Sequence, residues 1–170
     1  MRQLIIGFSH ARSPFAIGSS IIAISERQSY SHVYICCKDS DTDLDMVYQA
    51  SRGYVNSMTY GRFQKANVIC REYFLSCEDT TFKQIMKFMK SSLGLPYSRL
   101  QIIAIAIKRL FKIEINVYNR DAAFICSEFG TRVAQIGGIK YGKNLDFTTP
   151  EDVDKLLKAN NIPCTIYGVF

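Results

Sequence analysis

The sequence predicts an α+β fold in which helices pack on an antiparallel sheet. Strand patterns, in which apolar and polar residues alternate, are found mainly in the first half of the chain. Helical patterns, in which apolar residues recur every three or four positions, are found mainly in the second half. A length of 170 residues suits one domain with a sizeable core, and no repeat, low-complexity segment or linker divides it. We therefore expect residues 1–170 to form a single domain.

Three strands are expected in the first part of the chain. The apolar run Gln3–Phe8 indicates the first strand, and Ser9–Pro14 is expected to form a loop. Tyr30–Cys37 and Asp45–Ala50 have the alternation and the β-branched residues of strands. Because turn-forming residues such as Asp39 separate them, these two segments should pair as a hairpin.

Beyond the hairpin, the pattern predicts a loop, a strand and a helix. The polar, glycine-containing stretch Ser51–Asn67 is expected to be a long loop that lines one side of a cleft. Alternation over Ala66–Phe74 indicates a strand. Apolar residues with a helical period then predict a helix that begins at about Asp79 or Thr80 and ends at Gly94.

Two apolar segments allow more than one interpretation. Phe15–Ser25 fits a helix or a buried strand, and we expect a helix over about residues 16–24. Ser98–Lys112 is most simply a buried helix, although it could also present an apolar wall to a lipid substrate or a membrane surface. Its apolar run, Ile102–Ile107, is too short to span a bilayer, which takes roughly 20 residues. Phe111–Tyr118 is expected to be extended.

The functional prediction is built on a helix that begins at Cys126. Phe129, Val133 and Ile136 are spaced four and three residues apart, which places them on one helical face, and two glycines then end the helix. Unpaired N–H groups and the macrodipole at a helix N-terminus favour an anion, so a cysteine there has a lowered thiol pKa. Cys126 is therefore the candidate nucleophile.

The chain is expected to end with a loop, a short helix and a strand. Ile139–Phe147 has no regular pattern and should be the loop. Thr149 is suited to cap a helix with Pro150 at its first position and acidic residues in its first turn. Ile162–Phe170 indicates a closing strand.

The base that would activate the thiol is sought among the two histidines of the chain. His32 lies on the second expected strand and Gln49 on the third, so the hairpin could place Gln49 where it holds the imidazole in one tautomer. Cys126, His32 and Gln49 would then be a nucleophile, a base and an orienting group. The alternative for His32 is a core histidine without a catalytic role. His10 lies in an expected loop, as a solvated side chain or as a substrate contact.

Five short segments carry a resemblance to one known family. They are Ser31–Ile35, Val47–Ala50, Gly94–Tyr97, Ile125–Phe129 and Thr149–Asp152. In this order they resemble the motifs of the permuted papain-fold amidases, which are relatives of bacterial cell-wall endopeptidases and of lecithin:retinol acyltransferase. In that family the histidine strand precedes the cysteine helix, the reverse of the order in papain.

The resemblance implies a papain-like (permuted) fold and a cysteine hydrolase that cleaves an amide or peptide bond, with Cys126, His32 and Gln49 as its triad. The substrate would be a peptide or amide, with cell-wall peptide as the leading example, and the chemistry needs no metal or organic cofactor. Many relatives have glutamate where this chain has Gln49, and an amide stabilises an imidazolium less than a carboxylate does. Two alternatives stay open: a lipid acyltransferase or thioesterase with the same triad, and a non-catalytic binding module of the same fold.

Composition limits the partners and the setting. The formal charge of +6 and the pI near 9.0 fit either a merely basic soluble protein or one attracted to an anionic surface such as cell wall or lipid. Nucleic acid is not expected, because no basic run with interleaved aromatic residues stands out. The six cysteines lack zinc-ligand spacing, so those other than Cys126 are interpreted as reduced structural thiols. No secretory signal is recognised, and a soluble protein that is cytoplasmic where it is synthesised is expected.

Overall fold

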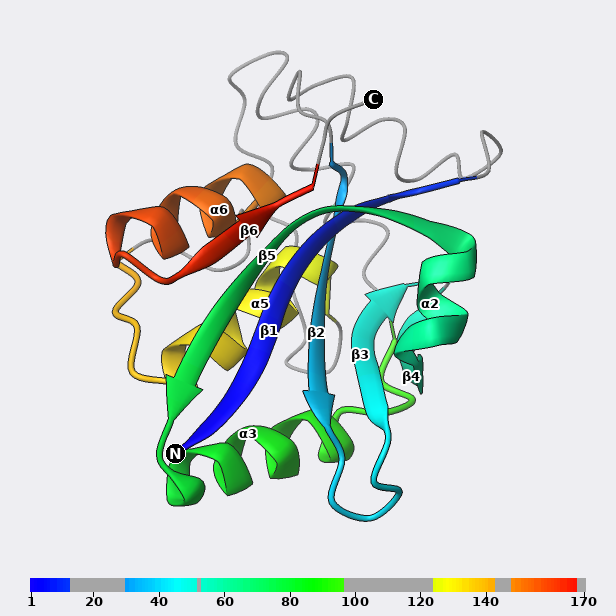
Figure 1. Ribbon diagram of the computed structural model, residues 1–170, viewed down its shortest axis with the longest axis horizontal. Helices are drawn as coiled ribbons and strands as arrows, with labels where there is room; N and C mark the ends of the chain where they lie inside the picture. Colours follow the sequence, from blue (N-terminus) through cyan, green and yellow to red (C-terminus); the bar gives the residue numbers. More distant parts are fainter. Residues whose placement is uncertain (13–29, 52, 97–123, 143–147, 168–170) are drawn as a thin grey trace.

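The computed structural model describes residues 1–12, 30–51, 53–96, 124–142 and 148–167. Its centre is a six-stranded sheet with the order β4-β3-β2-β1-β5-β6, in which every neighbouring pair is antiparallel (Figure 1). The strands are β1 (Arg2–Ala11), β2 (His32–Lys38), β3 (Asp45–Ser51), β4 (Tyr54–Thr59), β5 (Asn67–Cys77) and β6 (Cys164–Ile166). The α+β class predicted from the sequence is confirmed. The segments expected at residues 15–25 and 98–118 lie outside the described residues.

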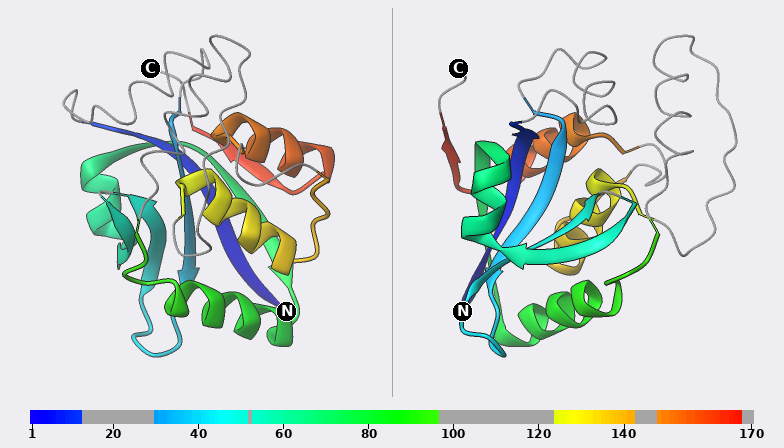
Figure 2. Two further views of the ribbon diagram at one scale, coloured as in Figure 1. Left: turned by 180° about the vertical axis from the view of Figure 1, so that it is seen from behind. Right: turned by 90° about the vertical axis from the view of Figure 1, so that its right-hand side faces the viewer.

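Within the described residues, helices lie against both faces of this sheet. They are α2 (Tyr60–Ala66), α3 (Asp79–Ser91), α5 (Cys126–Ile136) and α6 (Pro150–Ala159). Figure 2 shows α5 on one side of the sheet and α2 on the other. The larger hydrophobic core contains side chains of α3, α5 and α6, whereas a smaller cluster contains Phe63 of α2. Both faces of the central strands are therefore buried.

Alternation along β2 supplies side chains to both cores. Val33 and Ile35 lie in the larger core, whereas Tyr34 and Cys36 lie in the smaller cluster. A Cβ atom at Gly7 of β1 would overlap the ring of Tyr34, so glycine is required where this ring crosses the neighbouring strand. A shift of one residue in the pairing would exchange the two sets of side chains, and burial on both faces therefore fixes the register.

A buried carboxylate ties the smaller cluster to the end of the chain. Glu72 of β5 accepts hydrogen bonds from the hydroxyls of Tyr34 (2.6 Å), Tyr60 (2.7 Å) and Tyr167 (2.6 Å). The three tyrosines come from β2, from α2 and from the residue that follows β6. Burial first, and Glu72 second, raise the pKa of Tyr34 and of Tyr60, so both hydroxyls keep their protons and donate.

The helices on the larger core begin where the sequence predicted. α3 begins at Asp79, and its apolar face is buried in the larger core. α5 begins at Cys126. α6 follows a capping box, in which Thr149 Oγ1 accepts from the backbone N–H of Asp152 at 3.2 Å, and Asp152 Oδ2 accepts from the backbone N–H of Thr149 at 3.2 Å.

One expectation was wrong, because Ser51–Asn67 forms β4 and α2 rather than a loop. Two residues connect β3 to β4, and one of them, Gly53, has a φ of 97°, which glycine adopts without strain. The strand was not predicted because β4 is an edge strand of the sheet, and Val55 is its one fully buried residue. The helix α2 was not predicted because Phe63 is its one buried residue, so its sequence has no apolar stripe.

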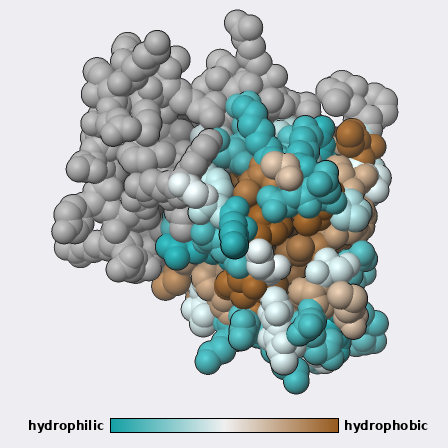
Figure 3. Space-filling model, turned by 90° about the vertical axis from the view of Figure 1, so that its left-hand side faces the viewer, coloured by the Kyte–Doolittle hydropathy of each residue, from teal (hydrophilic) through white to brown (hydrophobic). Residues whose placement is uncertain are grey.

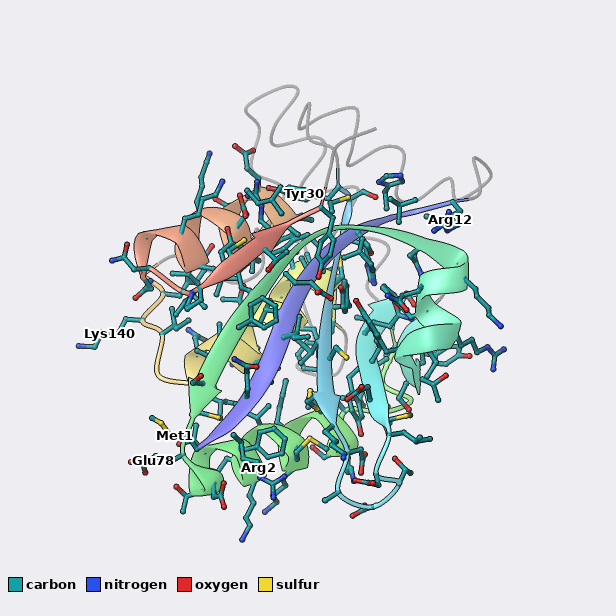
Figure 4. The ribbon with its side chains drawn as sticks, viewed as in Figure 1. Met1, Arg2, Arg12, Tyr30, Glu78 and Lys140 are labelled. Atoms are coloured by element: carbon teal, nitrogen blue, oxygen red, sulfur yellow. The ribbon has the colours of Figure 1, made fainter. Side chains whose placement is uncertain are left out.

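The ends of two strands also differ from expectation. β1 extends to Ala11 because it pairs with β5 along its whole length, so His10 lies in a strand, where its Nδ1 is 3.4 Å from the sulfur of Cys70. Arg12 then binds the carbonyls at the end of α2 (Figure 4). The closing strand is limited to Cys164–Ile166 within the described residues. On the side where α6 and β6 lie, apolar side chains are bordered by hydrophilic ones (Figure 3).

Candidate active site around His32

A direct hydrogen bond joins His32 and Gln49. β2 and β3 form the hairpin that the sequence predicted. His32 is the first residue of β2, Gln49 lies near the end of β3, and 2.7 Å separates His32 Nε2 from Gln49 Oε1. Gln49 is 5% exposed, so water competes little for this bond. Gln49 therefore lies where it can fix one tautomer of the imidazole.

A third polar residue, Asn56, sets the direction of this bond. Asn56 Nδ2 donates to the backbone carbonyls of Ser51 (3.1 Å) and Tyr54 (3.2 Å). Asn56 Oδ1 is thereby left to accept from Gln49 Nε2 at 3.2 Å. Gln49 then presents Oε1 to His32, and an amide oxygen can only accept. His32 accordingly carries its proton on Nε2 and leaves Nδ1 as the basic nitrogen.

Asn56 was missed in the sequence because it lies within the stretch expected to be a loop. The signal that would have found it is the two-residue connection between β3 and β4. In an antiparallel hairpin with that connection, Gln49 and Asn56 stand directly opposite each other. Phe63 was missed for the same reason, and its ring centroid lies 6.4 Å from that of His32.

Burial keeps His32 uncharged. It lowers the pKa of the imidazole from its ordinary value of 6.5 to about 4, and the hydrogen bond with Gln49 offsets only part of this shift. The apolar neighbour Phe63 is consistent with this dry setting. At neutral pH the ring is therefore neutral and has a lone pair on Nδ1 with which to accept a proton.

Cys126 lies at the start of the helix that packs on the same hairpin. Its side chain is 2% exposed and belongs to the larger core. α5 packs against β2 and β3, the two strands that carry His32 and Gln49. The approach is close because Gly130, one turn further along α5, faces Val33, and a Cβ atom there would lie 2.6 Å from Val33 Cγ1.

Polar contacts fix the first turn of α5. Ser127 Oγ donates to the carbonyl of Thr148 at 2.6 Å, and Thr131 Oγ1 donates to the carbonyl of Ser127 at 2.8 Å. An apolar residue, Ile125, occupies the N-cap, so no cap side chain competes for the N–H groups of this turn. These groups and the helix dipole favour negative charge at Cys126.

The three predicted site residues thus lie on two faces of the sheet. His32 and Gln49 are joined by a hydrogen bond on the face of the sheet that also carries Tyr34 and Phe63. Cys126 lies in the larger core on the opposite face, where α5 packs against Val33, so the structure does not bring Cys126 together with His32. Their catalytic roles stay predictions. No disulfide joins any of the six cysteines, all of which lie among the described residues. Burial raises the pKa of the thiols of Cys36 and Cys37, which is typical of unreactive core thiols.

Comparison with known proteins does not assign this chain to a family. No family model matches the sequence, and no curated protein matches it. Within the part of the chain that the structure describes, no helix is long and apolar enough to cross a membrane. The described residues also contain no cluster of three or more side chains suited to hold a metal ion.

Proposed function

We propose that this chain is a cysteine hydrolase that cleaves an amide or peptide bond. Cys126 is the nucleophile, His32 is the general base, and Gln49 orients His32. The observation that carries this proposal is the hydrogen-bond chain from Asn56 through Gln49 to His32, which leaves Nδ1 as the ring nitrogen able to accept a proton. A catalytic base needs such orientation, because it must present one defined nitrogen to its nucleophile.

The proposed reaction passes through a thioester. As the sulfur of Cys126 attacks the carbonyl carbon of the substrate, its proton moves to Nδ1 of His32. Backbone N–H groups at the start of α5 hold the oxyanion that forms, a contribution of about 3 kcal/mol for each donor. The C–N bond then breaks while Nδ1–H protonates the leaving amine. Water, deprotonated by Nδ1, finally hydrolyses the thioester, and the proton returns to the thiolate.

The low pKa of His32 determines how the thiol is activated. An imidazole with a pKa of about 4 does not hold the thiol proton before substrate arrives. The proton therefore moves during the attack, with His32 as a general base, rather than in a preformed ion pair. Because Cys126 and His32 lie on opposite faces of the sheet, a productive encounter requires the sulfur of Cys126 and Nδ1 to meet around the beginning of β2. The field at the start of α5 supports this step by favouring the developing thiolate.

The substrate class comes from the resemblance to permuted papain-fold amidases. A peptide or amide is proposed, with cell-wall peptide as the leading example. The formal charge of +6 supports attraction to an anionic surface that carries such a substrate.

Intact-protein mass spectrometry during substrate turnover tests the proposal. Peptides, cell-wall fragments and lipid thioesters are offered to the wild type and to the variant Cys126→Ala, with Cys36→Ala as a control that removes another buried thiol. We expect an acyl adduct on Cys126 and product release with amide substrates, both lost in Cys126→Ala and kept in Cys36→Ala. Adducts from lipid donors alone would indicate an acyltransferase or thioesterase. Equal behaviour of wild type and Cys126→Ala would contradict any catalytic role of this thiol.

A further inference from the structure

Ser9 of β1 is the residue directly opposite His32 in the pairing of β1 with β2. Directly opposed residues of an antiparallel pair share one face of the sheet, with Cβ atoms about 4.5–5.5 Å apart. Ser9 is 0% exposed, and among the described residues its hydroxyl has no hydrogen-bond partner. A dry, unpaired hydroxyl therefore lies beside the histidine of the proposed site.

Such a hydroxyl calls for an explanation, because a buried polar group without a partner costs free energy. Two other buried side-chain atoms of the described residues share this property, the hydroxyl of Tyr30 (labelled in Figure 4) and Nε of Arg71. Both belong to the surroundings of Asp154, which binds Arg71 and interacts with Tyr30. Of the three, Ser9 is the one that stands opposite a residue of the proposed site.

Ser9 is placed to serve Nδ1 of His32. Nδ1 is the ring nitrogen nearer to the Cβ atom, so a short side chain on the adjacent strand can approach it. The longer side chain of Gln49 reaches Nε2 from the strand on the other side of β2. While the ring is neutral, Nδ1 carries no hydrogen and cannot donate to Ser9, and the hydroxyl of Ser9 makes no hydrogen bond to the lone pair of Nδ1 either. Once the ring is protonated, Nδ1–H is a donor that needs an acceptor.

We propose that Ser9 is a positioning residue that accepts a hydrogen bond from Nδ1–H of protonated His32 and holds the imidazolium during catalysis. This inference rests on the proposed hydrolase function. The thiol proton of Cys126 moves to Nδ1, Ser9 Oγ accepts from the new N–H group, and the proton then passes to the leaving amine.

The effect of Ser9 on proton affinity follows from the charge of the ring. A hydrogen bond from a charged donor is about twice as strong as one between neutral groups, so Ser9 favours protonated over neutral His32. Gln49 on β3 and Phe63 on α2, which also face the ring, are uncharged. Among the described residues, the titratable groups on this face of the surrounding elements are Glu72 on β5 and the hydroxyls of Tyr34 and Tyr60 that donate to it, whereas Cys126 lies on the opposite face.

NMR titration of the imidazole side chains measures this effect directly. In Ser9→Ala the pKa of His32 should fall by about 0.7, a fivefold loss of proton affinity, whereas His10 serves as the internal reference. Ser31→Ala is the matched control, because it removes a buried hydroxyl adjacent to His32 in the chain. An unchanged pKa of His32 in Ser9→Ala, or an equal fall in Ser31→Ala, would overturn the proposal.

Two further readouts separate positioning from a structural role. Ser9→Ala should lower the alkylation rate of Cys126 at pH 7 about twofold, less than the loss of proton affinity, because a general base holds the proton only partly in the transition state. Its thermal midpoint should stay equal to that of the wild type or rise, because an unpaired buried hydroxyl has been removed. A lower midpoint with an unchanged rate would show that Ser9 is structural. If alkylation of Cys126 is independent of His32 as well, the hydrolase proposal fails, and the titration still decides the role of Ser9.

Discussion

The position of the proton on the neutral ring of His32 follows from the hydrogen bonds that connect the side-chain amides of Asn56 and Gln49 to it. The side-chain nitrogen of Asn56 donates to two backbone carbonyls, so its oxygen accepts from the nitrogen of Gln49. The oxygen of Gln49 is then the atom that accepts from His32. Each step is forced by the previous one, because an oxygen accepts and an amide nitrogen donates. At the scale of single residues, these hydrogen bonds determine which nitrogen of His32 carries the proton.

Replacing Gln49 with glutamate should raise the pKa of His32 by about one unit or more. A carboxylate in hydrogen-bond contact stabilises the imidazolium, which an amide does only weakly. Titration of the imidazole by NMR provides the measurement. Gln84→Glu on the exposed surface of α3 makes the same chemical change elsewhere and should leave His32 unaffected. Equal pKa values of His32 in the wild type and Gln49→Glu would mean that residue 49 does not contact the ring in solution.

The lowered pKa of His32 also predicts a loss of stability in mild acid. The folded protein holds this ring neutral down to a pH of about 4, whereas the unfolded chain binds a proton below about 6.5. Stability is therefore complete above pH 6.5 and falls by about 3 kcal/mol as the pH drops from 6.5 to 4. Denaturant unfolding at several pH values measures this slope. The pH dependence of stability should disappear in His32→Asn and remain in His10→Asn. The reverse result would show that His10, and not His32, causes it.

At the scale of elements, the contact of α5 with β2 depends on Gly130. A Cβ atom there would lie 2.6 Å from Val33, so Gly130→Ala should push the helix off the strand. We expect a loss of about 1–3 kcal/mol in denaturant unfolding and a slower reaction of Cys126, which the helix carries. Gly61→Ala is the matched control, because its Cβ would meet open space in α2, and it should be neutral or slightly stabilising. Equal stability of the two variants would show that α5 does not pack closely on β2.

The elements that could be predicted from sequence are those with a buried face. β2, β3, α3 and α5 each put several apolar side chains into a core, and the resulting periodicity predicted them. β4 and α2 each bury one residue, Val55 and Phe63, so their sequences show no apolar periodicity from which to predict a strand or a helix. For the same reason the pairing of His32 with Gln49 was predictable, whereas the role of Asn56 was not. Asn56 could be placed only once β4 was known.

At the scale of the whole molecule, one buried ion pair links the sheet to α6. Arg71 Nη1 lies 2.5 Å and 2.7 Å from the two carboxylate oxygens of Asp154, to which Tyr73 also donates at 2.6 Å. Burial alone would raise the pKa of Asp154, but the hydrogen bonds from Tyr73 and Arg71 outweigh it and lower this pKa. Asp154 therefore stays charged at neutral pH and holds α6 against β5.

Removing this charge should weaken the whole fold. Asp154→Asn leaves Arg71 without its partner in a largely buried setting, and we expect a loss of about 3 kcal/mol in denaturant unfolding. Asp43→Asn breaks an exposed pair with Lys38 and should cost less than about 1 kcal/mol. Similar values for the two variants would show that the buried pair adds little to stability.

The central claim, a thiol activated by His32, is tested most directly by the alkylation rate of each cysteine against pH. Peptide mass spectrometry reads iodoacetamide labelling at all six positions, with Cys36 as a buried comparison and Cys164 as an exposed one. In the wild type, Cys126 should react faster than the others well below pH 8.5, where an ordinary thiol titrates, and should slow only as His32 becomes protonated near pH 4. This advantage should disappear in His32→Ala. If Cys126 behaves as an ordinary thiol with or without His32, the chain is not a cysteine hydrolase of this kind.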